Sequence, residues 1–192
     1  MKNGLIIGGV ILLIVMIFGS GYNSMVGLQE DSIKSWADVE TQYQRRADLI
    51  PNLVKVVKSY AEHEKSTLTE VVEARAKATA VNINPGTMTS SDMQNYANAQ
   101  SGLGGALSKL MVVVEKYPDL KANQNYMQLQ AQLEGTENRI AVARSRFNET
   151  TTEYNKTIKS FPKVMFAGML GFSERPLFEA SSGAEIAPEI DM

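Results

Sequence analysis

The first 29 residues contain a single charged side chain, Lys2, and the next charged residue is Glu30. Between them, residues 4–21 form an uncharged and mostly apolar run of 18 residues. That is about the minimum length for a helix that crosses the ~30 Å hydrocarbon core of a bilayer. Backbone groups in hydrocarbon must satisfy their own hydrogen bonds, so a spanning segment has to be helical. The sequence therefore predicts a transmembrane anchor at residues 1–21, in contact with lipid through residues 4–21.

A cleaved secretory signal is the alternative interpretation of this segment. Lys2 would supply its positive end, and residues 19–21 (Gly-Ser-Gly) are small enough for a cleavage site. However, the apolar run is long for a signal, and no A-x-A-like triplet follows it. We therefore expect the segment to be retained. The N-terminal amine and Lys2 favour a cytoplasmic N-terminus, which would place the following domain outside the cytoplasm.

Residues 28–84 lack glycine and contain one proline, Pro51. Apolar residues recur there at helical spacing, and four of them lie seven positions apart: Trp36, Tyr43, Ile50 and Val57. We expect a long helix that bends at Pro51, because proline removes one backbone hydrogen bond and clashes with the preceding turn. A complete break into two helices is possible at Pro51 or near His63.

Two further helices are predicted after a loop at residues 82–90. Ser91 and Gln94 are spaced as a capping box for the first of them, which ends near Tyr117. Glycines at 102, 104 and 105 suggest close approach to another helix. The second helix lies between Pro118 and Pro162, and its apolar row repeats every seven residues: Tyr126, Leu133, Ile140, Phe147, Tyr154 and Phe161.

Together these patterns predict an all-α protein: an N-terminal transmembrane helix followed by an antiparallel bundle of three to four long helices. The seven-residue repeat alone would also fit a coiled coil. The bundle domain is predicted at residues 22–178. Residues 161–178 are apolar and contain glycine, so they either fold back over one end of the bundle or contact a partner or the membrane surface. Residues 179–192 have the composition of a disordered acidic tail.

The residue types that most enzymes use are scarce. The chain has no cysteine and one histidine, His63, so a metal site with several imidazole or thiolate ligands is impossible. No nucleophile motif is present, and we expect neither a cofactor nor a bound metal. Acidic and basic residues nearly balance, with a net charge of −2, which argues against a nucleic-acid partner.

Four charged residues lie on or beside the apolar stripes: Arg46 and Glu64 in the first helical region, and Glu137 and Arg144 in the last. An unpaired buried charge is costly, so we expect them to find partners across the bundle. Such pairs would fix the register of the helices. The more specific hypothesis is a polar layer that recognises a ligand or a partner.

Five stretches of the sequence, spread from Tyr22 to Phe178, resemble the LemA family, and together with the N-terminal anchor the resemblance extends over nearly the whole chain. They are YNSMVGLQEDSIKSWADVETQ from Tyr22, RRADLIPNLVKVVKSYAEHE from Arg45, YPDLKANQNYMQLQAQLEGTENRIAVAR from Tyr117, YNKTIKSFP from Tyr154 and GFSERPLF from Gly171. The resemblance implies a single-pass bacterial cell-membrane protein with a four-helix domain and no agreed enzymatic activity. Asp48, Pro51 and Asn52 belong to the family pattern. Relatives in magnetosome-forming bacteria are associated with building that membrane compartment.

From the sequence we expect a non-enzymatic scaffold that self-associates into homo-oligomers and organises or remodels membrane or membrane-protein assemblies. The first alternative is a sensor or adaptor. Its bundle would bind a ligand or peptide near Arg46 and Asp48 and couple to a membrane protease or receptor kinase. The second alternative is a hydrolase that uses carboxylates only. The candidate interaction residues are therefore Arg46, Asp48, Asn52, Glu64, Glu137 and Arg144.

Overall fold

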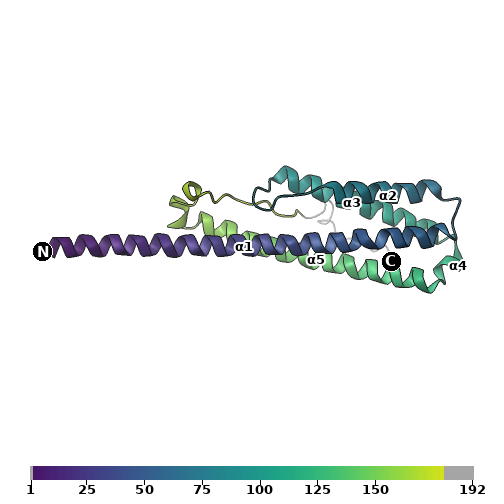
Figure 1. Ribbon diagram of the computed structural model, residues 1–192, viewed down its shortest axis with the longest axis horizontal. Coiled ribbons are helices and arrows are strands. Elements are labelled where there is room, and N and C mark those ends of the chain that lie inside the picture. The colour runs from purple at the N-terminus through teal and green to yellow at the C-terminus, as the bar shows by residue number, and fades with distance from the viewer. Residues whose placement is uncertain (1, 180–192) are drawn as a thin grey trace, which may run out of the picture.

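A computed structural model describes residues 2–179, and in these residues it contains helices and no strands (Figure 1). The elements are α1 (Lys2–Lys58), α2 (Lys65–Ala80), α3 (Ser90–Val114), α4 (Pro118–Lys121), α5 (Gln124–Lys159) and the 3-10 turns η1 (Lys163–Met165) and η2 (Gly168–Leu170). The four long helices alternate in direction along the molecule. The predicted all-α bundle behind an N-terminal apolar helix is thus confirmed. The expected tail falls mainly on residues 180–192, outside the described part of the chain.

Helix α1 is 57 residues long, or about 85 Å at ~1.5 Å per residue. Its N-terminal part extends beyond the other helices, and none of the other described elements reaches that end of the molecule (Figure 1). Large apolar side chains cover this extension and are exposed, namely Ile6, Ile7, Ile11, Leu12, Leu13, Val15, Met16, Ile17 and Phe18. Among the described helices, α1 is the one long and apolar enough to cross a membrane.

Pro51 does not end α1, and a contact with α2 compensates for the hydrogen bond that the proline removes. Pro51 lies inside α1, which continues to Lys58. Because proline has no N–H, the carbonyl of Ala47 one turn earlier loses its usual helical donor. Arg75 of α2 supplies a donor instead, and its Nε lies 2.8 Å from that buried carbonyl oxygen. The helix is interrupted between Lys58 and Lys65 instead, near His63, which was the other position predicted for a break.

The core forms three clusters along the length of the bundle. The cluster farthest from the N-terminus is aliphatic and is centred on Ile50, Leu53 and Leu110. The middle cluster is aromatic, and its members include Trp36, Tyr43, Tyr96, Phe147 and Phe178. The cluster nearest the apolar extension contains Met25, Tyr154, Ile158, Phe166, Ala167 and Phe172. The two predicted seven-residue rows supply residues to all three clusters, and they are buried except for Phe161, which lies beyond the end of α5.

Two local predictions were wrong. The capping box of α3 is formed by Thr89 and Asp92, two residues before the predicted pair, and Asp92 Oδ2 accepts from the Thr89 backbone N–H at 3.0 Å. The glycines of α3 do not make room for a neighbouring helix. A Cβ atom at Gly102, Gly104 or Gly105 would meet nothing within 4 Å.

Candidate functional site

Arg46 is the centre of a polar network that joins all four long helices. From α1, its Nη1 donates to Glu137 Oε1 of α5 at 2.6 Å. Its Nη2 donates to Gln100 of α3, at 2.8 Å to Oε1 and 3.1 Å to the backbone oxygen. Gln100 Nε2 in turn donates to the carbonyl oxygen of Ala78 in α2 at 3.2 Å. One buried guanidinium therefore fixes the register of the bundle, as the sequence led us to expect for Arg46 and Glu137.

Two tyrosines lie beside this network. The Arg46 guanidinium carbon is 5.0 Å from the centre of the Tyr43 ring, and the Tyr43 and Tyr96 rings meet edge to face at 5.4 Å. Burial raises the pKa of Tyr43, and burial together with the neighbouring Tyr43 and Glu40 raises the pKa of Tyr96. Both phenols consequently stay neutral at physiological pH. Tyr43 packs against the cation, and Tyr96 packs against Tyr43.

An extended segment runs back along α5 after the last 3-10 turn, and we name residues 173–179 the strap. Two asparagines of α5 bind its backbone in the same way. Asn155 Nδ2 donates to the Arg175 oxygen at 2.7 Å, and its Oδ1 accepts from the Arg175 N–H at 2.9 Å. Asn148 forms the equivalent pair of bonds with Phe178, both at 2.9 Å.

The spacing of these bonds follows from the geometry of helix and strand. Asn148 and Asn155 are seven residues apart, a rise of about 10.5 Å on a helix. Arg175 and Phe178 are three residues apart, which spans about 10 Å in an extended chain. The two amides therefore match the strap at every third residue, and the strap runs antiparallel to α5. Because both contacts use backbone groups, they set the path of the strap without selecting its side chains.

Side chains of the strap supply the anchors. Phe178 enters the aromatic cluster, where its ring centre is 5.9 Å from Trp36 and 5.7 Å from Phe147. The guanidinium carbon of Arg144 lies 4.5 Å from the centre of the Phe178 ring. Arg175 is buried and donates from Nη1 to the Gln29 oxygen of α1 at 3.3 Å. The strap thus ties α5 to α1 by both backbone and side-chain contacts.

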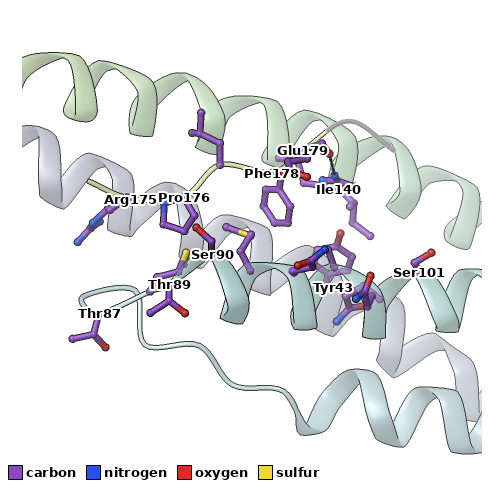
Figure 2. Close-up of a pocket in the computed structure, with 18 of the residues that line it drawn as sticks. Tyr43, Thr87, Thr89, Ser90, Ser101, Ile140, Arg175, Pro176, Phe178 and Glu179 are labelled. Atoms are coloured by element: carbon purple, nitrogen blue, oxygen red, sulfur yellow. Dashed lines mark hydrogen bonds between the residues drawn. The ribbon is translucent and has the colours of Figure 1, made fainter. Parts of the chain in front are cut away.

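A groove of about 1620 Å³ lies between the strap and α3. The loop before α3 and its first turn form one side, with Thr87, Thr89 and Ser90, and the strap with Pro176 and Phe178 forms the other (Figure 2). Charged lining residues of both signs come from three elements, and they are Arg46, Glu137, Arg144, Glu174, Arg175 and Glu179. The bare backbone of Gly104 and Gly105 also faces this space.

The structure brings together three of the six predicted interaction residues. Arg46, Glu137 and Arg144 all line the groove. Asp48 is exposed and accepts from Gln44 Nε2 of its own helix at 2.8 Å. Asn52 is also exposed and lines a shallow depression of about 500 Å³ elsewhere. Glu64 precedes α2 and accepts from the Tyr117 hydroxyl at 3.2 Å.

Our sequence reasoning missed Gln100, Asn148 and Asn155. A signal for the asparagines was present, since both are spaced by seven beside the buried Phe147 and Tyr154. Gln100 had no comparable signal, because its role depends on how α2 and α3 meet α1. The strap itself was visible only as part of an apolar stretch expected to fold over the end of the bundle.

The groove is arranged for binding more than for acid–base chemistry. Among its carboxylates, Glu137 is paired with Arg46, and Glu174 forms an ion pair with Lys159. Within residues 2–179, no group of three or more His, Asp or Glu side chains could hold a metal ion. The arrangement can hold helices in register and offer a mixed-charge surface to a bound chain.

Fold and site together define a membrane-anchored helical-bundle protein. The chain belongs to the LemA family, whose family model matches residues 35–192. It is 27% identical over 191 residues to the magnetosome protein MamQ of Magnetospirillum gryphiswaldense, covering 88% of this chain and 70% of that protein. The identity and the two coverages are the same for magnetosome protein MamQ 1 of Paramagnetospirillum magneticum. Protein LemA of Metamycoplasma hominis is 23% identical over 179 residues, with 89% and 78% covered.

Proposed function

We propose that this protein is a non-enzymatic scaffold, anchored in a bacterial membrane, whose bundles self-associate and organise membrane or membrane-protein assemblies. The observation that carries the proposal is the continuity of α1. One helix contains both the apolar extension and Arg46, the centre of the network that joins the four long helices. A bundle built in this way is joined to its anchor without a flexible linker, as a scaffold requires.

The roles of the buried and half-buried polar side chains support the same proposal. Arg46 and Glu137 bond to each other across the bundle. The side chains of Asn148 and Asn155 are both occupied by hydrogen bonds to the backbone of the strap. These polar side chains hold elements together and leave little for catalysis. Relatives that carry the name magnetosome protein are consistent with work at a membrane compartment.

The test is the mass of the full chain in discs of native lipid cut from the membrane with a polymer. We expect a defined oligomer. A control chain in which residues 4–21 are replaced by an alternating Leu-Ala span separates the contribution of the anchor from that of the bundle. An oligomer that survives the replacement assigns association to the bundle. A strict monomer at native abundance would contradict the proposal.

The groove favours one alternative, a sensor or adaptor that binds a peptide or ligand and couples to a membrane protease or receptor kinase. Its volume of about 1620 Å³ exceeds the ~300–1,000 Å³ usual for small-molecule pockets, so the groove has room for a peptide. Affinity capture from membranes with the wild-type chain and with Arg144→Glu, followed by mass spectrometry, tests this alternative. Loss of one defined membrane protein from the variant would support it, and identical captures would oppose it.

A further inference from the structure

Residues 161–172 form a compact apolar projection beside α1, which we name the knob. It contains η1 and η2 and lies at the end of the bundle from which the apolar extension of α1 emerges (Figure 1). Lys163 is its only charged residue. The knob is therefore strongly apolar, and its position relative to the membrane decides whether it contacts water, lipid or protein.

Contacts with α1 fix the height of the knob along the anchor. Phe166 stacks on Phe18, a residue inside the uncharged run, with ring centres 4.4 Å apart. A Cβ atom at Gly21 would lie 3.0 Å from Phe166 Cζ, so the missing side chain at Gly21 is what admits the ring. One turn farther on, Lys163 Nζ donates to Ser24 Oγ at 2.9 Å. The knob thus covers the last turn of the apolar run and the first turn after it.

The outer side of the knob is apolar and uncovered. Phe161 and Met169 are each 81% exposed and Met165 is 68% exposed, and Val164 and Leu170 add to the same projection. Its inner side, with Phe166, Ala167 and Phe172, is buried. Leaving several large apolar side chains in water forgoes the favourable free energy of transferring them to an apolar environment.

We propose that the knob is a second membrane contact, in which Phe161, Met165 and Met169 insert into the boundary between headgroups and acyl chains beside the anchor. If the uncharged run of α1 occupies the hydrocarbon core, Phe18 lies in its final turn, and the stacked Phe166 brings the knob to the same depth. A short apolar segment with one lysine suits this boundary, where the amine reaches the headgroups. The occupant is lipid because the exposed surface of the knob continues the lipid-facing surface of α1.

Such a contact would also restrain the bundle. A single transmembrane helix can tilt and rotate in the bilayer and carries its bundle with it, whereas a second contact at its side fixes which face of the bundle meets the membrane. The inference rests on the membrane-anchored part of the proposed function and is independent of self-association.

The absence of cysteine allows a direct test with the full chain. Single cysteines replace Phe161 or Met169, and each is labelled with an environment-sensitive fluorophore in nanodiscs that hold one copy per disc. The matched controls are Val142→Cys and Val112→Cys, whose native side chains are 70% and 67% exposed on α5 and α3. We expect a blue shift, loss of quenching by aqueous iodide and strong quenching by lipids spin-labelled near the headgroup, at positions 161 and 169 only.

Iodide quenching at 161 and 169 equal to that at 142 would overturn the proposal. Protection that develops only when several copies share a disc would overturn it too, because a second copy would then cover the knob. Since one copy per disc suffices for the expected result, a monomeric protein can still pass this test even if the scaffold proposal fails.

Discussion

At the scale of single residues, Arg46 illustrates how one charge can specify a bundle. A guanidinium has five N–H donors in a planar fork, so a single side chain can reach Gln100 on one helix and Glu137 on another. Burying a charge is unfavourable unless its donors are used. The pairing therefore penalises alternative registers, in which the same charge would be buried without these acceptors.

Replacing Arg46 with methionine should lower the free energy of unfolding by about 1–3 kcal/mol, because Gln100 loses a buried donor. Glu137 is half exposed and can be rehydrated, which limits the loss. The neighbouring Arg45 is exposed on the same helix, so Arg45→Met is the control and should change stability by less than about 0.5 kcal/mol. Thermal unfolding of the full chain in detergent, followed by circular dichroism, measures both. Equal stability of the two variants, with an unchanged assembly state, would remove the role given to Arg46.

At the scale of elements, Pro51 and Arg75 show how a helix defect becomes a contact between helices. The proline leaves the Ala47 carbonyl, on the buried side of α1, without its helical donor. Helix α2 is placed so that Arg75 donates a hydrogen bond to this carbonyl instead. Helix α1 continues past Pro51 to Lys58, and the carbonyl that the proline leaves open is paired.

This arrangement predicts coupling between the two residues. Arg75→Met should cost about 1–2 kcal/mol, because it leaves the buried carbonyl of Ala47 without a donor. Pro51→Ala restores the helical N–H, so in that background Arg75→Met should cost much less. A double-mutant cycle on thermal stability measures the difference, and Lys77→Met, at an exposed position of α2, is the control for loss of charge. Additive effects would contradict the proposed compensation.

The strap predicts a local change without global unfolding. Asn155→Ala removes two hydrogen bonds to the backbone of Arg175, and Asn148→Ala removes two from Phe178. Each should make opening of the strap easier by about 1–3 kcal/mol, seen as faster amide hydrogen exchange in residues 173–179. Asn138→Ala, at an exposed position of the same helix, should leave that exchange unchanged. Uniform acceleration throughout α5 would instead indicate that the asparagines support the whole bundle.

At the scale of the whole molecule, the bundle and the membrane are joined by one uninterrupted helix. A flexible linker would let the domain diffuse around its anchor, but α1 is one continuous helix from Lys2 to Lys58. With the knob proposed as a lipid contact on one side of α1, the strap and its groove would have a defined orientation to the bilayer. Assemblies of such units would hold their members at a common height, which is why the oligomer and the knob are the two decisive measurements.

The sequence by itself determined the helical elements and their buried faces. The uncharged run, the seven-residue rows through Trp36 and Tyr126, and the loop around Pro85 are local patterns whose period is set by helix geometry. Arg46 and Glu137 could also be chosen from sequence, since a charge on an apolar row needs a partner.

Only the tertiary structure decided which groups meet. The donor for the Ala47 carbonyl that Pro51 leaves open comes from another helix, since Arg75 lies 24 positions further along the chain than Pro51. The path of the strap depends on matching two helical turns of α5 to three extended residues. The knob was placed against Phe18 by packing at Gly21, between segments more than a hundred residues apart. Local periodicity records which face of a helix is apolar, but the identity of the group across from it is a property of the folded chain.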